Sequence, residues 1–437
     1  MNEDERLVQR ARAVIAPPAR TCYPITIGRG RGTVVTSVDG RRFLDFTSGL
    51  AVLNLGHNHP KVMEAVQRQL KRHVHAGAIC CSQTTVAAAE ELVSIAPDGL
   101  DMLFFGNSGT EAVEDALKLA RYTTGRQSII ACTGGFHGRT MGALSLTSNS
   151  SACRRGYQPL LPSVYHVNYP ACFTCQCGLN PEACGGRCLE EIERLFQCQV
   201  PPEEVCAMVV EPFLGEGGYN AAPESYLKGL RRICDEYGIL LIFDEVQSGV
   251  GRTGRWFCCE HAGVRPDIVT VANAVASGFP LGAVVASTEL LRQWDLPAHG
   301  STLGGNPVSC AAAVATLKVI REEGLLEAAR VAGSRMLSFL QELAAQNPRV
   351  GEVRGMGCMI GVEFVDEAGG ADGTLCEELI DKCLGKGLIL IGCGLKRNVV
   401  RLIPPLNVTD GELGEGMAIL ADVLHELSGK VRNQGRM

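Results

Sequence analysis

No stretch of this sequence approaches the ~20 consecutive apolar residues that a helix needs to cross a bilayer. The first residues, MNEDERLVQRARAV, are charged and lack the apolar core of a secretory signal peptide. We therefore expect no membrane-spanning segment and a cytoplasmic location.

Clusters of basic residues are also missing. The net charge is −6, and lysine and arginine are spread along all 437 residues. Because nucleic-acid-binding surfaces concentrate positive charge on one face, we expect no nucleic-acid partner. The sequence likewise contains no internal repeat and no low-complexity linker.

Cysteine, in contrast, is abundant, with 20 residues. In a protein of the cytoplasm a disulfide framework is not the first expectation. Many of these cysteines, such as Cys206, Cys234 and Cys310, lie inside apolar patterns. This placement predicts that they are small buried side chains.

Five further cysteines lie in a turn-rich insertion before an expected helix: Cys172, Cys175, Cys177, Cys184 and Cys188. Thiolates at such spacings are compatible with a tetrahedral zinc site, for which Cys172, Cys175, Cys184 and Cys188 are the candidate ligands. The spacing is irregular and one cysteine is surplus, so disulfides and free thiols remain alternatives.

Short apolar runs alternate with helical patterns through the middle of the chain. Strands are expected at 102–105, 128–132, 207–210, 239–243, 267–271 and 282–286. Alternation of this kind predicts an α/β fold with a mainly parallel sheet covered by helices. With 46% hydrophobic residues the chain can bury a large core, and its length predicts two domains.

After about residue 315 the pattern changes. A long helical stretch at 316–343 leads into strand-like CMIGVEFV, a helix near 374–386, the strand-like segments LILIG and VVRLIPPL, and a final helix. Thr409 and Glu412 have the spacing of a capping box at the start of that helix. We expect a second, smaller α+β unit here.

The segment Phe105–Glu111 joins a strand to a helix through small residues. A turn of this kind at a helix start presents free N–H groups and the positive end of the helix dipole, both of which suit a phosphate. A simple helix cap, with Ser108 and Glu111 as the capping pair, is an equally good interpretation.

A second loop, Gly135–Thr140, follows the strand at 128–132, at the sheet edge where open α/β proteins bind ligands. Phe136 could cover one face of a planar ring, and Arg139 could hold a carboxylate. An ordinary loop with a core phenylalanine and a solvated arginine is the alternative.

Two neighbouring strands are followed by carboxylates, Glu211 and Asp244, which are costly to bury without partners. Asp244 could hold a cationic heterocycle nitrogen, and structural salt bridges are the alternative. Arg401 is flanked by apolar residues, so its guanidinium requires either a protein carboxylate such as Glu216 or a substrate carboxylate.

Taken together, the segments resemble the class III aminotransferases of the ornithine, acetylornithine and 4-aminobutyrate type, which are pyridoxal-phosphate enzymes of fold type I. The resemblance rests on LDFTSGLAVLNLGHNHP at 44–60, NSGTEAVEDALKLAR, FHGRT, EPFLGEGG, FDEVQSGVGRTG, STLGGNP and RLIPPL. It implies an N-terminal segment (1–60) that joins the small domain, a large cofactor-binding domain (61–315) and a C-terminal small domain (316–437).

By resemblance, Gly109 and Thr110 hold the cofactor phosphate, with Gln247 and Thr302 nearby. Thr302 would reach across from a partner subunit, which implies a homodimer with shared active sites. Phe136 and Val246 would contact the two faces of the ring. Asp244 would pair with the ring nitrogen, keeping it protonated as an electron sink. The full set of expected cofactor contacts is Gly109, Thr110, Phe136, His137, Glu211, Asp244, Val246, Gln247 and Thr302.

The substrate residues implied by the resemblance are Leu50, Arg139, Glu216 and Arg401. A Glu216–Arg401 pair would close the α-carboxylate site for an ω-amine donor and open it for glutamate or 2-oxoglutarate. The implied reaction moves an amino group from an ω-amino acid, 4-aminobutyrate-like or ornithine-like, to 2-oxoglutarate.

The sequence departs from the family pattern at one position. Asn273 follows Asp244 by 29 residues, where the family has the lysine that forms the Schiff base and shuttles a proton. Asparagine can do neither, so the chain is expected to be impaired or inactive. No other lysine is expected nearby, since Lys118 lies along the helix after the phosphate turn and Lys396 belongs to the small unit.

Two explanations are open for Asn273: an engineered or erroneous substitution in an ordinary aminotransferase, or a natural homologue that has lost transamination. The presence of Asp244, Gln247 and Arg401 favours the first. Two other functions stay as alternatives, an amino-acid racemase on the same scaffold and a non-catalytic pyridoxal-phosphate-binding protein.

Overall fold

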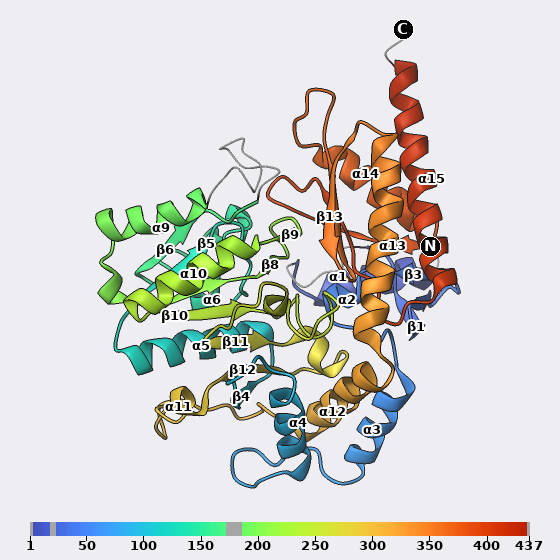
Figure 1. Cartoon of the computed structure of the whole chain (residues 1–437). Helices are drawn as coiled ribbons and strands as arrows, with labels where there is room; N and C mark the ends of the chain where they lie inside the picture. Colours follow the sequence, from blue (N-terminus) through green and yellow to red (C-terminus); the bar gives the residue numbers. More distant parts are fainter. Residues whose placement is uncertain (1–2, 18–22, 172–185, 435–437) are drawn as a thin grey trace.

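The computed structural model describes residues 3–17, 23–171 and 186–434, and its centre is a seven-stranded sheet (Figure 1). The strand order is β4-β12-β11-β10-β7-β5-β6. These strands are β4 (Met102–Gly106), β5 (Ser128–Cys132), β6 (Val164–Val167), β7 (Val205–Val210), β10 (Leu240–Asp244), β11 (Ile268–Val271) and β12 (Gly282–Ala286). All except β6 lie where the apolar runs predicted them.

The sheet is mainly parallel, which confirms the predicted α/β fold. β10 is parallel to β7 and β11, and β5 is parallel to β6 and β7. β12 is antiparallel to both of its neighbours, β4 and β11. The carboxyl ends of β5, β7 and β10 therefore meet at one edge.

Helices cover both faces of this sheet. Alternate strand residues point to opposite faces; Phe243 packs in the same buried cluster as Leu230 of α10, while Ile242 packs in the cluster of Ala116 of α5. The helices of this part are α3 (Pro60–Leu70), α4 (Gln83–Val93), α5 (Gly109–Thr124), α6 (Met141–Leu146), α7 (Ser151–Arg154), α9 (Arg187–Cys198), α10 (Glu224–Tyr237), α11 (Thr288–Leu291) and α12 (Pro307–Glu322).

The C-terminal part forms an antiparallel sheet with the order β13-β14-β17-β16. In Figure 1 its long helices α13 and α15 run alongside each other, away from the seven-stranded sheet. Its elements are α13 (Leu325–Ala345), β13 (Val350–Met356), β14 (Met359–Phe364), α14 (Gly373–Gly385), β16 (Ile391–Cys393), β17 (Val399–Leu402) and α15 (Asp410–Gln434).

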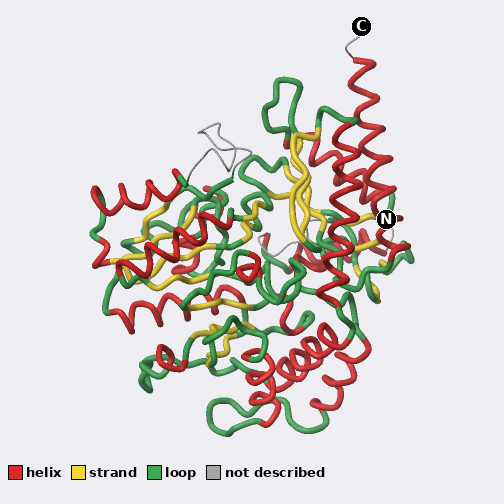
Figure 2. Tube along the Cα trace, in the orientation of Figure 1, coloured by secondary structure: helices red, strands yellow, loops and turns green. Residues whose placement is uncertain are grey.

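A third sheet joins the two ends of the chain, with β15 parallel to β3 so that Leu388 lies opposite Leu44. Figure 2 shows the strands gathered in separate groups with helices around them. The remaining elements are α1 (Glu3–Val14), β1 (Ile27–Arg31), β2 (Val34–Ser37), β3 (Arg42–Asp45), α2 (Ser48–Ala51), η2 (Pro202–Glu204), β8 (Phe213–Leu214), β9 (Asn220–Ala221), η3 (Cys258–His261), η4 (Asn273–Ala276) and β15 (Leu388–Ile389).

Two C-terminal predictions differ from the structure. The helical stretch at 316–343 is divided at Gly324, whose positive φ of 63° ends α12 and starts α13. The run LILIG forms two short strands in different sheets, β15 and β16, instead of one. The Thr409–Glu412 capping box is confirmed, because each residue's side chain accepts the other's backbone N–H.

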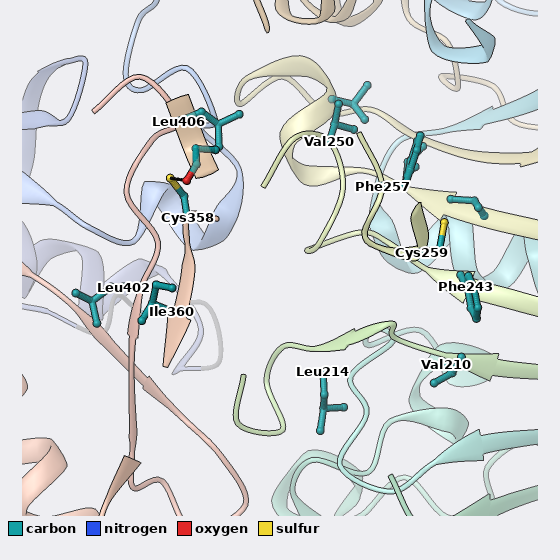
Figure 3. Packing of buried hydrophobic residues seen from close by; sticks show 14 of the residues in the cluster. Val210, Leu214, Phe243, Val250, Phe257, Cys259, Cys358, Ile360, Leu402 and Leu406 are labelled. Carbon is teal, nitrogen blue, oxygen red and sulfur yellow. Dashed lines mark hydrogen bonds between the residues drawn. The ribbon is translucent and has the colours of Figure 1, made fainter. Parts of the chain in front are cut away.

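One buried cluster links the main sheet with the C-terminal sheet. Figure 3 labels Val210 and Phe243 from the first and Ile360 and Leu402 from the second as members of this cluster. The predicted burial of Cys206, Cys234 and Cys310 is confirmed. Across the described residues, no helix is long and apolar enough to cross a membrane.

Candidate active site

The carboxylate of Asp244 lies at the end of β10 and pairs with a histidine from the loop after β5. His137 Nδ1–H donates to Asp244 Oδ2 over 2.7 Å, and both side chains are almost fully buried. Burial alone would lower the pKa of His137, but the hydrogen bond and charge of Asp244 outweigh it, so this pKa is raised. The pair is thus a charge-assisted contact inside the protein.

The second oxygen of Asp244 is also occupied. Oδ1 accepts from the Val246 amide at 3.1 Å and from the Thr270 hydroxyl at 3.0 Å. A carboxylate offers about four acceptor positions. The three donors found among the described residues leave Asp244 able to accept one more hydrogen bond.

Glu211 follows β7, the strand next to β10, and holds two loops together. Its carboxylate accepts the Phe136 amide at 2.9 Å and the Gly215 amide at 2.9 Å. Burial, the largest cause, raises the pKa of Glu211 to about 7. The partners are backbone amides, so the salt bridge considered for this carboxylate is not what the structure shows.

The turn before α5 forms the helix cap that was one of the two interpretations of its sequence. Ser108 caps the helix by accepting the Glu111 amide at 3.3 Å. Gly109 packs closely against Val246, since a Cβ on this glycine would lie 2.7 Å from the valine Cγ1. The helix N-terminus and the loop after Asp244 therefore lie together.

The loop with Phe136 and Arg139 closes over the same helix start. The Thr110 hydroxyl lies 2.8 Å from the Thr140 hydroxyl and accepts the Arg139 amide at 3.2 Å. Phe136 is half-buried, and the exposed Arg139 guanidinium lies 5.4 Å from the centre of its ring. Two loops that are distant in sequence thus form one surface at the end of the sheet.

Glu216 and Arg401 form an ion pair between the β8–β9 hairpin and β17. The Arg401 side chain is 3% exposed and also donates to the Gly392 carbonyl, whereas Glu216 is 27% exposed. Arg401 also lies 5.7 Å from the ring of Tyr219. Burial opposes the charge of Arg401, but Glu216 more than compensates and the pKa is raised. Glu216, the protein carboxylate considered as a partner for Arg401, is therefore in contact with it.

Asn273 begins η4, just beyond β11, whose Thr270 binds Asp244. Its backbone has a φ of 36°, a left-handed conformation that asparagine tolerates better than most residues. Its side-chain amide donates to the Leu50 carbonyl at 3.3 Å. The side chain at 273 is thus used for a contact with α2.

The remaining predicted residues occupy different settings. Gln247 accepts from the Tyr219 hydroxyl at 2.9 Å, while Leu50 and Thr302 are exposed. Lys118 lies 2.6 Å from His299 and Lys396 is exposed. Of the candidate zinc ligands, Cys172, Cys175 and Cys184 lie outside the described residues, and Cys188 is half-buried.

Sequence reasoning missed three polar residues that support this site: Thr270, Tyr219 and Thr147. Thr147 accepts the His137 amide at 3.0 Å. The alternation within β11 could have placed Thr270 beside Asp244, since the register pairs these two residues. Nothing in the local sequence marks Tyr219 or Thr147.

Comparison with known proteins finds relatives over almost the whole chain. The chain is 37% identical to 5-aminovalerate aminotransferase of Pseudomonas aeruginosa, covering 97% of this chain and 99% of the relative. It is 36% identical to 4-aminobutyrate aminotransferase of Escherichia coli, covering 98% and 99%. It is also 36% identical to alanine/serine racemase of Pyrococcus horikoshii, covering 98% and 92%.

Solved structures agree with this result. An (S)-enantioselective omega-transaminase from Thermomicrobium roseum superposes with a TM-score of 0.90 at 32% identity, covering 96% of this chain and 98% of that one. The family model described as aminotransferase class-III matches residues 15–424. The protein therefore belongs to the class-III aminotransferases, a family of pyridoxal-phosphate-dependent enzymes.

Proposed function

We propose that this chain is built to move an amino group from an ω-amino acid, 4-aminobutyrate-like or ornithine-like, to 2-oxoglutarate, and that Asn273 leaves it impaired or inactive. The observation that carries the proposal is the buried Arg401 held by the partly exposed Glu216. Relatives named for 4-aminobutyrate and 5-aminovalerate support the donor class.

The residues present fit pyridoxal 5′-phosphate. Asp244 can accept one more hydrogen bond, as a protonated ring nitrogen requires, and the start of α5 offers helix N–H groups beside Gly109 and Thr110 for a phosphate. Phe136 and Val246 supply apolar contacts, and Gln247 lies in the same loop as Val246. When bound, the cofactor supplies an electron sink for the substrate carbanion.

The Glu216–Arg401 pair would select between the two substrates of such a reaction. With the pair closed, Arg401 is neutralised and does not attract a carboxylate, which suits a donor whose amino group is remote from its carboxylate. When Glu216 moves away, the Arg401 guanidinium is left without its carboxylate and can bind the α-carboxylate of glutamate or 2-oxoglutarate. Arg139, exposed above Phe136, would hold the distal carboxylate, and Leu50 would line the same site.

Asn273 is the residue that would limit this chain. A lysine amine at 273 could take a proton from the substrate carbon and pass it to the cofactor, whereas an amide has no basic lone pair for that role. Loss of a positioned general base costs about 10²–10⁴ in rate. The chain would then bind cofactor reversibly, through contacts that do not need residue 273.

We also propose a homodimer with shared active sites. Large apolar side chains are exposed at Leu50, Ile79 and Leu303, and the exposed Thr302 directly precedes Leu303 in the chain. Contact with a second copy would cover these side chains and bring Thr302 to the partner's cofactor phosphate. We propose in addition that the chain is divided into the parts 1–60, 61–315 and 316–437, and that the protein is located in the cytoplasm.

Two alternatives have support of their own. An amino-acid racemase is supported by the relative from Pyrococcus horikoshii named alanine/serine racemase. A non-catalytic cofactor-binding protein is supported by Asn273 itself. Both alternatives predict no transfer of an amino group from an ω-amino acid to 2-oxoglutarate.

Restoring lysine separates these functions. Asn273→Lys should retain the cofactor covalently after borohydride reduction, seen as a mass increase, and should convert amino donors in the presence of 2-oxoglutarate. Asn273→Gln is the matched control, because it lengthens the side chain without adding an amine. If Asn273→Lys retains the cofactor but converts no donor from a panel of ω-amino acids, the aminotransferase proposal is wrong, and racemisation without oxo-acid consumption would identify the racemase.

A further inference from the structure

The segment that leads to Thr302 is attached along the length of α5. Tyr122, near the end of this helix, donates from its hydroxyl to Asp295 Oδ2 at 3.2 Å. Nearer the start of α5, His299 contacts two residues of the helix. Lys118 Nζ lies 2.6 Å from His299 Nδ1, and Asp115 Oδ1 lies 2.7 Å from His299 Nε2. The segment thus runs back along α5 toward the proposed phosphate site.

The His299 ring contacts two aromatic side chains and two charged ones. Its ring stacks on Trp294 with centroids 4.6 Å apart and lies 4.8 Å from Phe104. The Lys118 ammonium can only donate, so His299 Nδ1 accepts and Nε2–H donates to Asp115. The Asp115 side chain is 7% exposed, and burial raises its pKa even though His299 opposes this. This line of three polar groups fixes the position of the imidazole.

The residues after His299 keep Thr302 in place. The Ser301 hydroxyl accepts the Gly304 amide at 3.0 Å, and a side chain at Gly304 would collide with the Phe105 carbonyl. Thr302 itself is exposed and makes no hydrogen bond to any residue that the structure describes. Its hydroxyl is therefore presented outward from a segment that is attached on both sides.

We propose that His299, held between Lys118 and Asp115, is a positioning residue that presents Thr302 to the cofactor phosphate of a second copy of the chain. The inference rests on the proposed homodimer with shared sites. It gives α5 two roles. The first turn holds the phosphate of its own subunit, and the middle of the helix carries the segment that completes the other subunit's site.

The test compares two ligands that differ only in the phosphate. Because Asn273 cannot form a covalent link, the affinity of the unaltered chain for pyridoxal phosphate and for pyridoxal can be measured at equilibrium by absorbance titration. His299→Ala and Thr302→Ala should each weaken pyridoxal phosphate binding about tenfold, the value of one charge-assisted hydrogen bond, and leave pyridoxal binding unchanged. The double variant should lose no more than either single one.

Controls separate positioning from folding and from failure of the proposed function. Thr123→Ala, near the end of the same helix, loses only hydrogen bonds within that helix and should change neither affinity by more than about twofold. If His299→Ala does not stay dimeric in sedimentation, Lys118→Met carries the test, with an expected selective loss of about threefold. Equal loss of both ligands, or losses that add in the double variant, would overturn the positioning role. An unchanged affinity in Thr302→Ala would instead overturn the shared site.

Discussion

The two acid–base pairs of the site, Asp244–His137 and Glu216–Arg401, differ in how they are held. Asp244 and His137 are both buried, and their neighbours come from the edge of one sheet. Glu216 is 27% exposed and lies on a hairpin, while its buried partner Arg401 belongs to the C-terminal sheet. The first pair is buried on both sides, whereas the second has a partly exposed carboxylate, and in the proposed function it opens when Glu216 turns toward solvent.

Breaking the closed pair should have the largest effect. Asp244→Ala removes the carboxylate and leaves His137, Val246 and Thr270 without their acceptor in a buried site. We expect the free energy of unfolding, measured in urea at pH 7, to fall by about 3–5 kcal/mol. Asp244→Asn keeps an acceptor and should cost less. A loss below about 1 kcal/mol in Asp244→Ala would contradict a permanent pair.

Breaking the openable pair should change selectivity more than stability. In the Asn273→Lys background, Glu216→Gln frees Arg401 from its charged partner. The ratio of kcat/KM for 2-oxoglutarate to kcat/KM for the ω-amino donor should rise by about 10–150-fold, since a charge-assisted bond contributes about 1.5–3 kcal/mol. Steady-state kinetics with both substrates measure this ratio. Equal changes for both substrates would mean that the pair is structural.

The pH dependence of stability tests the closed pair further, because Glu211 lies close enough to His137 and Asp244 for their charges to affect its pKa. Its folded-state pKa of about 7 is above its ordinary value, so folding binds a proton between these values. The stability that this proton contributes is complete below about pH 4.5 and is lost as pH rises through 7. In urea unfolding, wild type should lose on the order of 2 kcal/mol more than Glu211→Gln between pH 5 and pH 8. Parallel curves would exclude a titrating Glu211.

The smallest effect is expected at Asn273. Asn273→Ala removes the 3.3 Å bond to the Leu50 carbonyl and places alanine in a left-handed conformation. The expected cost is about 1 kcal/mol in the free energy of unfolding. Asn273→Gly, which loses the same bond but tolerates the backbone, should cost less. If glycine is the worse of the two, the positive φ is not what favours asparagine here.

Much of this architecture could be predicted from the sequence. The apolar runs marked six strands of the main sheet, because a buried strand needs apolar side chains on both faces. β6 was missed because VYHV is short and half-buried and contains a histidine. The division at Gly324 and the split of 388–393 depend on backbone geometry and sheet pairing, which hydrophobic patterns do not encode.

The sequence by itself determined the family and led to the prediction of impaired chemistry, since side-chain identity and spacing are local properties. The prediction that Asn273 lies at the lysine position rests on its spacing from Asp244 alone. Only the tertiary structure showed which partners are in contact. Asp244 binds His137, 107 residues away, and Arg401 binds Glu216, 185 residues away. Sheet order and the packing of one sheet against another bring such residues together, and neither can be read from distance along the chain.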